Sequence, residues 1–226
     1  MPNGSPPTPT FADAVARARA GLEARPPRSL SVPGFRGAAV LLALLDRPEG
    51  PTILFTRRSA TLPHHGGEIS LPGGGLEPGE SPEAGALREA EEEVGLAPDR
   101  VELLGRLDDL VSVARFVVTP VVGAVGAPPE VFHAQAGEVE EPFELPLGRL
   151  LDPAIRRAAL WDPARFPPEI ATLVRELREP FEEVDPETGR WRVWSFHADP
   201  ARVVWGLTAR MLSELFARAF PRDQGR

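Results

Sequence analysis

The sequence predicts an α+β fold, in which a sheet is layered against helices that do not alternate regularly with its strands. Residues 37–45 form a continuous apolar run bounded by turn residues, which is typical of a buried central strand. Shorter strand patterns follow this run, and helical patterns stand near both ends and in the middle of the chain. This irregular order favours α+β layers over a doubly wound sheet.

The N-terminal elements follow from spacing and from turn signals. Phe11, Val15, Ala18 and Leu22 recur at helical intervals, so we expect a helix over residues 9–24. The elements expected next are a strand at 37–45, a turn at 46–51 and a returning strand at 52–56.

A central helix has clear boundaries. Ser81 is a favourable N-cap, and Pro82 suits the first helical position. Gly95 suits the left-handed residue that ends a helix. We therefore expect a helix over residues 82–94.

The C-terminal half combines both kinds of element. Apolar or alternating segments predict strands at 101–107, 116–125 and 191–196, with a Pro- and Gly-rich loop at 126–137. Helical patterns predict helices at 147–160, 168–178 and 200–220, the last carrying Val204, Leu207, Met211, Leu215 and Phe216.

Three carboxylates gather on one face of the central helix. At about 100° per residue, Glu89, Glu92 and Glu93 point within roughly 100° of one another. Gly85 lies on the same side and leaves room for a bulky neighbour. The opposite side is expected to be the buried stripe of this helix, made of Ala84, Leu87, Ala90 and Val94.

The spacing of these carboxylates costs helix stability, because like charges one turn apart repel. A hard divalent cation reverses that cost, since Mg²⁺ prefers carboxylate oxygens and substrate phosphates. A solvated acidic face is the other interpretation of a Glu-rich helix. Here the flanking glycines, Glu80 and Arg88 favour a metal site.

Composition excludes several kinds of chemistry. The 226 residues carry a formal net charge of −8, which argues against a nucleic-acid-binding surface. The chain has no Cys, Lys or Tyr, so thiol nucleophiles, Schiff bases and phosphate-loop lysines are absent. Cationic side chains that bind phosphate are therefore expected to be Arg. We find no transmembrane run and no signal-peptide pattern, and we expect a cytoplasmic protein.

Residues 74–96 read GGLEPGESPEAGALREAEEEVGL. This stretch resembles the Nudix box, the strand–loop–helix motif of hydrolases that cleave nucleoside diphosphates linked to another group. The one departure is Ala90, where a larger aliphatic residue is usual. The resemblance implies a Nudix fold, a mixed β-sheet sandwiched between α-helices, here with N- and C-terminal helical extensions. It also implies Mg²⁺ or Mn²⁺ held by Glu89, Glu92 and Glu93, and a water that attacks phosphorus.

Residues 54–74 read LFTRRSATLPHHGGEISLPGG and resemble the signature of the coenzyme A pyrophosphatase branch of that family. Two further stretches, at 138–147 and 204–210, resemble runs in the same branch. Pro63 stands where the branch carries an Arg. The positions that match the signature are Leu54, Thr56, Arg58, Ser59, Gly67, Pro72, Gly73 and Gly74.

By that resemblance, the reaction is hydrolysis of coenzyme A, or of an acylated or oxidised form, to 3′,5′-ADP and 4′-phosphopantetheine. Glu89 and Glu93 are the first choice for direct metal ligands, with Glu92 sharing ions or holding the water. The carbonyl of Gly73 is a further candidate ligand. Arg88 is expected to orient the carboxylates.

The general base is expected among three acidic residues that follow the loop at 126–137. We favour Glu138 over Glu140 and Glu141, with a solvated edge as the open alternative.

Substrate contacts are expected near the end of the strand at 52–56. Arg58 is expected to bind the 3′-phosphate of coenzyme A, because a guanidinium grips phosphate through two parallel hydrogen bonds. Arg57, His64 and His65 are the residues expected to replace the branch Arg at position 63. Because side chains alternate along a strand, only one of the two arginines is expected to face the ligand.

We expect two parts in the chain: residues 1–33 as an N-terminal arm with one helix, and residues 34–226 as a Nudix hydrolase domain that includes the C-terminal helix. The expected partner is a small-molecule substrate, with no nucleic acid and no membrane, and a homo-oligomer stays open. Two other functions also stay open. One is a Nudix hydrolase of another nucleotide such as ADP-ribose, and the other is a non-catalytic nucleotide-binding module.

Overall fold

A computed structural model describes residues 8–60, 66–165, 168, 185 and 187–221. In this part of the chain the main sheet has eight strands. β1 and β7 lie parallel at its centre, and the other pairs are antiparallel, so the sheet is mixed. The strands are β1 (Arg36–Leu45), β2 (Thr52–Arg58), β3 (Ile69–Ser70), β4 (Gly73–Gly75), β5 (Glu102–Arg106), β6 (Leu110–Val111), β7 (Phe116–Val125) and β8 (Val139–Pro146).

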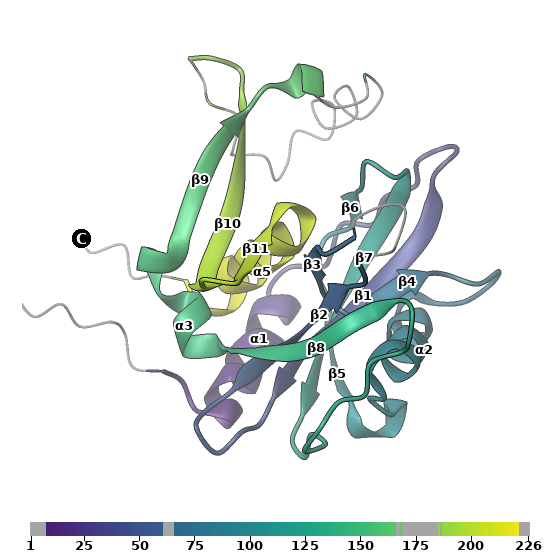
Figure 1. Cartoon of the computed structure of the whole chain (residues 1–226), viewed down its shortest axis with the longest axis vertical. Coiled ribbons are helices and arrows are strands. Elements are labelled where there is room, and N and C mark those ends of the chain that lie inside the picture. The colour runs from purple at the N-terminus through teal and green to yellow at the C-terminus, as the bar shows by residue number, and fades with distance from the viewer. Residues whose placement is uncertain (1–7, 61–65, 166–167, 169–184, 186, 222–226) are drawn as a thin grey trace, which may run out of the picture.

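Helices cover both faces of this sheet (Figure 1). Along β1, Leu41 and Leu45 pack toward α2 (Pro82–Val94), whereas Leu42 and Leu44 pack toward α1 (Phe11–Glu23) and α5 (Gly206–Ala219). The strand is apolar on both faces because both are buried, which explains its continuous run of apolar residues. The α+β class, with a mixed sheet between helices, is therefore confirmed.

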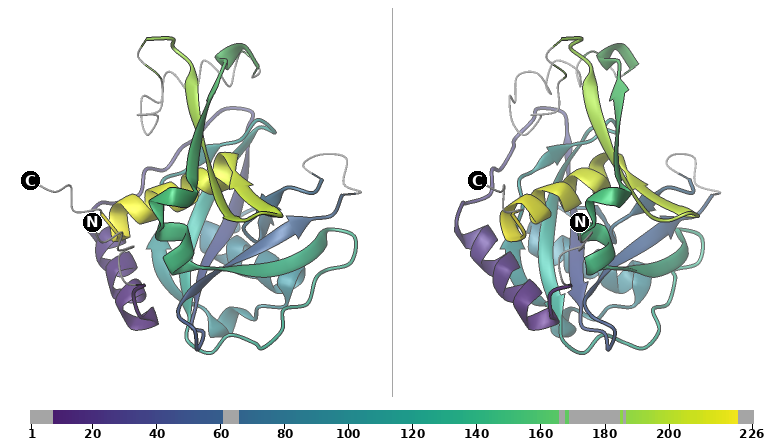
Figure 2. Two further views of the ribbon diagram at one scale, coloured as in Figure 1. Left: turned by 60° about the vertical axis from the view of Figure 1, so that its left-hand side comes forward. Right: turned by 90° about the vertical axis from the view of Figure 1, so that its left-hand side faces the viewer.

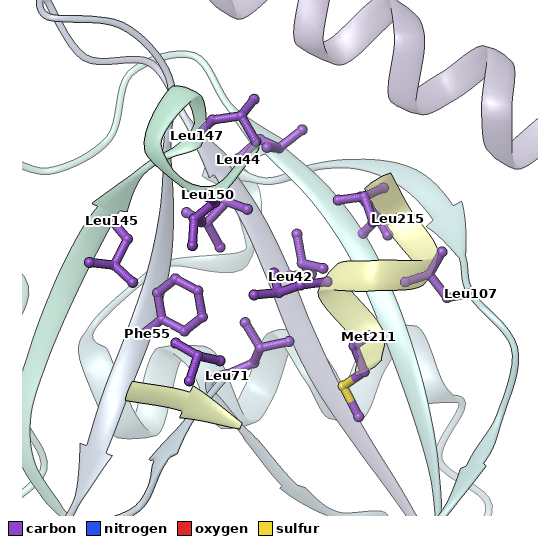
Figure 3. Close-up of a cluster of buried hydrophobic side chains, with 14 of the residues drawn as sticks. Leu42, Leu44, Phe55, Leu71, Leu107, Leu145, Leu147, Leu150, Met211 and Leu215 are labelled. Atoms are coloured by element: carbon purple, nitrogen blue, oxygen red, sulfur yellow. The ribbon is translucent and has the colours of Figure 1, made fainter. Parts of the chain in front are cut away.

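The larger of the two cores lies between the sheet and α5 (Figure 3). Phe55 of β2 is fully buried there, and its ring stacks on Phe143 of β8 with centroids 5.7 Å apart. Leu147 and Leu150 of the short α3 (Leu147–Leu151) close one end of this core.

A second, three-stranded sheet follows α3. It consists of β9 (Arg156–Trp161), β10 (Trp191–Asp199) and β11 (Arg202–Trp205), in the order β11–β10–β9. β9 and β10 project beyond the main body (Figures 1 and 2). Short 3₁₀ turns complete the described elements: η1 (Pro98–Arg100), η2 (Pro153–Ile155) and η3 (Pro163–Arg165).

The described part of the N-terminal arm packs onto the main body. Ala14, Ala18 and Leu22 of α1 are buried in the same core as α5. Asp108, between β5 and β6, accepts hydrogen bonds from Arg25 at 2.8 Å and from Arg218 of α5 at 2.6 Å. The boundary expected at residue 34 stays a prediction. No helix in the described ranges is long and apolar enough to cross a membrane.

Most elements expected in the N-terminal two thirds are confirmed within a few residues. The expectation of a helix over 147–160 is wrong beyond residue 151. Pro153 begins a 3₁₀ turn, and residues 156–161 then form β9 because β10 supplies a hydrogen-bonding partner. The helix expected at 200–220 begins only at Gly206, since residues 202–205 pair with β10 as β11. Residues 169–178, expected to be helical, lie outside the described residues.

Sequence reasoning missed β8. The acids at its start were expected to follow a loop, with a solvated edge as the open alternative, but residues 139–146 pair along the whole of β2. Its partner strand lies some ninety residues earlier in the chain, so no local sequence pattern predicts that β8 forms.

Candidate functional site

The helix α2 forms over the residues that the sequence predicts. The hydroxyl oxygen of Ser81 accepts a hydrogen bond from the backbone N–H of Ala84 at 3.2 Å, and Pro82 opens the helix. Gly95 ends it with φ 71°, and its N–H returns to the carbonyls of Ala90 and Glu91. The carboxylates are therefore held on a helix with both ends capped.

The expected orientation of α2 needs correction. Ala84 is exposed and Leu87 is only partly buried, whereas Ala86, Ala90, Glu93 and Val94 are buried. The core stripe is thus rotated toward Glu93. One acidic residue of the proposed set borders the apolar core instead of lying opposite to it.

Glu93 is the most buried of these carboxylates, with 2% of its surface exposed. One carboxylate oxygen accepts the N–H of Gly73 at 3.0 Å, and the other lies 3.8 Å from a guanidinium nitrogen of Arg58. Burial raises the pKa of Glu93 to about 7, and these two contacts only partly oppose that rise. A nearby cation would therefore stabilise the ionised form of Glu93.

Glu89 lies against the glycine strand β4. A Cβ atom on Gly74 would lie 2.5 Å from the Glu89 carboxylate, so any other residue here would displace that carboxylate. Burial raises the pKa of Glu89, although a hydrogen bond from Arg88 works against it. Gly73 and Gly74 thus bring one strand into contact with two carboxylates.

Arg88 connects the remaining acidic residues. It donates two hydrogen bonds to Glu80, at 2.9 and 3.0 Å, and one to Glu89 at 2.9 Å. It also donates to Glu92 at 3.2 Å and to the carbonyl of Gly75 at 3.0 Å. The pKa of Glu80 is lowered by Arg88 first and by the N–H of Glu77 second. The expected orienting role of Arg88 agrees with these contacts.

The space beside Gly85 is filled from within the protein. A Cβ on Gly85 would collide with the side chain of Leu76 and come within 3.1 Å of Glu80. The bulky neighbour expected from the sequence is therefore Leu76 of the loop between β4 and α2.

Glu138 approaches the same carboxylates from the loop before β8. That loop is fixed to the end of α2, where the N–H of Gln135 donates to the carbonyl of Glu93 at 2.9 Å. The carbonyl of Glu138 accepts the N–H of Ser59 at 2.8 Å. The charge of Glu138 contributes to the raised pKa of both Glu89 and Glu93, so its carboxylate lies on their side.

Glu141 has a different role. It forms an ion pair with Arg202 of β11 at 2.6 Å, and a nitrogen of Arg57 lies 3.9 Å from it. Its carboxylate therefore links β8 to β11, and among the acids at 138–141 the site contacts favour Glu138.

Arg57 and Arg58 have separate partners, as the alternation of a strand predicts. Arg57 lies by Glu141 and donates to the carbonyl of Ala201 at 3.3 Å, whereas Arg58 lies by Glu93. Pro63, His64 and His65 lie outside the described residues.

The donor set fits a hard divalent cation. Glu89, Glu92 and Glu93 offer carboxylate oxygens on neighbouring turns, and the two more buried acids have raised pKa values that a cation would lower. In the part of the chain that the structure describes, no three Asp, Glu or His side chains lie close enough to hold one ion as they stand. The reason is that Arg88 holds Glu89 and Glu92 while Glu93 turns to Gly73.

Comparisons with known proteins agree with this architecture. Residues 35–183 match the model of the NUDIX domain. A protein of Cronobacter sakazakii named "Uncharacterized Nudix hydrolase NudL" is 45% identical over 129 residues, covering 56% of this chain and 66% of that protein. The protein of the same name from Enterobacter sp. (strain 638) is 37% identical over 193 residues, covering 84% and 86%. The crystal structure of the Nudix hydrolase RenU from M. smegmatis is 24% identical, with a TM-score of 0.45, and covers 64% of this chain and 84% of that one.

The burial of Glu93 predicts a pH-dependent stability. Its folded-state pKa of about 7 lies above the ordinary 4.5, so its contribution is complete below about pH 4.5 and is lost as pH rises through about 7. Without metal, Glu93→Gln should therefore be more stable than the wild type at about pH 8, by up to about 3 kcal/mol. The difference should disappear below about pH 4.

Urea denaturation in the presence of a chelator measures both free energies of unfolding. Glu91→Gln, on the exposed side of the same helix, is the matched control and should show no such trend. Equal pH dependence in wild type and Glu93→Gln would contradict the burial argument.

Proposed function

The chain belongs to the Nudix family, and we propose that it hydrolyses the diphosphate of coenzyme A, or of an acylated or oxidised form, to 3′,5′-ADP and 4′-phosphopantetheine. The observation that carries this proposal is the position of the two described parts of residues 54–74, the stretch similar to the coenzyme A branch. It begins in β2 with Arg58 beside Glu93, and it ends in β4 with Gly73 and Gly74 against Glu93 and Glu89. The substrate signature and the carboxylates therefore belong to one site.

Glu89, Glu92 and Glu93 are the residues that would hold Mg²⁺ or Mn²⁺. Such a cation offsets the charge of a diphosphate and lowers the pKa of a bound water. The protein contributes the spacing of the carboxylates, and the glycines of β4 allow the backbone to approach them closely.

Arg88 supplies the counter-charge that keeps these acids together. Its guanidinium bridges Glu80 in the loop and Glu89 and Glu92 on the helix. We assign it the role of fixing the carboxylates before substrate arrives. The bidentate contact with Glu80 anchors it to the loop, so its release from Glu89 or Glu92 leaves the guanidinium in place.

Glu138 is our choice for the general base that takes a proton from the attacking water. A base needs reach to that water more than any special sequence context. The backbone contacts with Ser59 and Gln135 fix Glu138 between β2 and the end of α2, on the side of Glu89 and Glu93. Glu92, with half of its side chain exposed, is the other residue that we assign to the water.

The position of Arg58 beside Glu93 favours a contact with the diphosphate over the contact with the 3′-phosphate that the sequence suggested. Its distance of 3.8 Å from Glu93 puts its guanidinium beside a proposed metal ligand. We therefore assign Arg58 to a diphosphate oxygen instead of the 3′-phosphate.

Product analysis tests the function. With Mg²⁺ or Mn²⁺, the protein should convert coenzyme A to 3′,5′-ADP and 4′-phosphopantetheine, identified by mass spectrometry. Glu93→Gln should reduce turnover by orders of magnitude, because a charged ligand becomes neutral while its shape is kept. A higher kcat/KM for ADP-ribose would move the substrate assignment to that class, and no turnover of any diphosphate would favour a non-catalytic module.

The base assignment predicts different results for two neighbouring acids. Glu138→Gln should lower kcat by about 100-fold or more, the usual contribution of general-base catalysis. Glu140→Gln is the matched control, since Glu140 is exposed on β8, and its kcat should stay within about twofold of the wild type. Equal losses in both variants would contradict the role of Glu138.

The position of Arg58 predicts equal effects on two substrates. Arg58→Ala should lower kcat/KM for coenzyme A and dephospho-coenzyme A alike, by about one to two decades, because a charged hydrogen bond is worth about 1.5–3 kcal/mol. Arg57→Ala, whose guanidinium lies by Glu141, should change either value little. A loss confined to coenzyme A would instead assign Arg58 to the 3′-phosphate.

A further inference from the structure

In the site built around α2, the 3′-phosphate of coenzyme A has no assigned partner. Arg58 is assigned to the diphosphate, and Arg57 lies by Glu141. The 3′-phosphate and the diphosphate are attached to the 3′ and 5′ carbons of one ribose, so the groups that bind them must lie close together. Because the chain has no Lys, a further Arg near the carboxylates is the expected partner of this phosphate.

Arg36, the first residue of β1, has these properties. It is exposed, and among the described residues no carboxylate forms an ion pair with it. Its Cζ atom lies 4.4 Å from the centre of the ring of Phe116, the residue opposite in β7. A cation–π contact orients the plane of a guanidinium but leaves its N–H groups free to donate hydrogen bonds.

The turn before β7 fixes the backbone of this pair. The N–H of Arg36 donates to the carbonyl of Arg115 at 3.1 Å, and the N–H of Phe116 donates to the hydroxyl of Ser112 at 3.1 Å. Arg115 has a φ of 61°, the one positive value among the described residues other than glycine. Such a conformation is uncommon for a residue with a side chain and persists only where the surrounding structure holds it.

Arg36 and the carboxylates lie on opposite sides of the glycine strand β4. This strand pairs with β1 and with no other strand among the described residues, so it forms an edge of the main sheet. A side chain at Gly74 would point to Glu89 on the side of α2. Arg36 lies on the other side, because Phe116 beneath it packs against the core that α5 covers.

Gly75 leaves the path between these two sides open. Its carbonyl accepts a hydrogen bond from Arg88 at 3.0 Å, so it borders the carboxylate site. It is exposed, and no described atom outside its chain neighbours lies within 4 Å of the place that a Cβ would take. Gly75 pairs with Ala38, two residues after Arg36, so the Cα atoms of Gly75 and Arg36 are about 8 Å apart.

We propose that Arg36 binds the 3′-phosphate of coenzyme A and sets the preference for coenzyme A over its dephospho form, while Phe116 holds the guanidinium in position. This assignment rests on the proposed function, because it requires the diphosphate to lie at the carboxylates. The substrate crosses the edge strand at Gly75, where it meets no side chain. The N–H groups in the plane of the Arg36 guanidinium then donate two parallel hydrogen bonds to the phosphate.

Two substrates that differ only in the 3′-phosphate test the assignment. In Arg36→Ala, the ratio of kcat/KM for coenzyme A to kcat/KM for dephospho-coenzyme A should fall by about tenfold or more, because a charged hydrogen bond is lost. Arg36→Lys keeps the charge but not the planar fork, so its ratio should lie between those of the wild type and Arg36→Ala.

Two further variants separate the role of Arg36 from general effects. Phe116→Leu removes the ring that orients the guanidinium, so it should raise the KM for coenzyme A more than the KM for the dephospho form. Arg19→Ala is the matched control for the loss of charge. Arg19 of α1 pairs with Glu102, and its replacement should leave the ratio unchanged.

Calorimetric titration gives a readout that does not depend on turnover. The wild type should bind 3′,5′-ADP more tightly than AMP, which lacks the 3′-phosphate. Arg36→Ala should weaken the binding of 3′,5′-ADP by about tenfold or more. Its binding of AMP should stay within about twofold of the wild type, because an exposed side chain is replaced.

Equal kcat/KM of the wild type for the two substrates would overturn the assignment and leave the proposed function intact. So would an Arg36→Ala variant that loses both substrates alike, or neither. If the wild type hydrolyses neither substrate, the proposed function fails and the assignment of Arg36 fails with it. Circular dichroism of each variant checks folding, and replacement of the exposed Arg36 should not disturb it.

Discussion

The grouping of three carboxylates around the guanidinium of Arg88, beside the buried Glu93, is the constraint on which the site depends. Glu89, Glu92 and Glu93 occupy neighbouring turns of α2, where like charges repel. Arg88 contacts Glu89 and Glu92, and it is itself fixed by two hydrogen bonds to Glu80. Glu93 has no contact with Arg88 among those described. Burial raises its pKa, so the neutral form is favoured over the charged one. Arg88 thus offsets the charges of Glu89 and Glu92, whereas the more distant Arg58 offsets that of Glu93 only in part, and a divalent cation would favour the ionised form of all three.

The glycines of β4 allow this strand to lie close to both β1 and the carboxylates of α2. Gly73 pairs with Val40 of β1, and a Cβ atom at Gly73 would lie 2.5 Å from the Cα of Val40. Its φ of 154° also belongs to the region that favours glycine. The Gly73 N–H can therefore reach Glu93 while β4 stays paired to the central strand. A side chain at Gly73 would collide with β1 and one at Gly74 would displace the Glu89 carboxylate, so the two glycines link sheet packing to carboxylate position.

Local signals in the sequence predict much of the fold and of the site. Ser81, Pro82 and Gly95 fix the ends of α2 through neighbouring backbone groups, so its bounds can be read from a short window. β8 and β9 differ because each becomes a strand through a partner far away in the chain, and Ala and Leu in β9 favour a helix when they are considered alone. The burial of Glu93 likewise depends on residues far away in the chain. A helical projection gives the angles between side chains, but the packing of Ala86 and Ala90 against β1 decides which side of the helix faces the core.

The two faces of the main sheet divide the tasks of the protein. α2 and the carboxylates lie on one face, whereas α1 and α5 cover the other and are linked through Asp108, which accepts hydrogen bonds from Arg25 just after α1 and from Arg218 of α5. Glu141 and Arg202 extend the second layer, because they tie β8 to β11 at the start of α5. β2 belongs to both systems, with Arg58 facing Glu93 and Arg57 facing Glu141. Adjacent residues of a strand point to opposite sides. Arg57 and Arg58 therefore connect the carboxylate site to the layer that carries the second sheet.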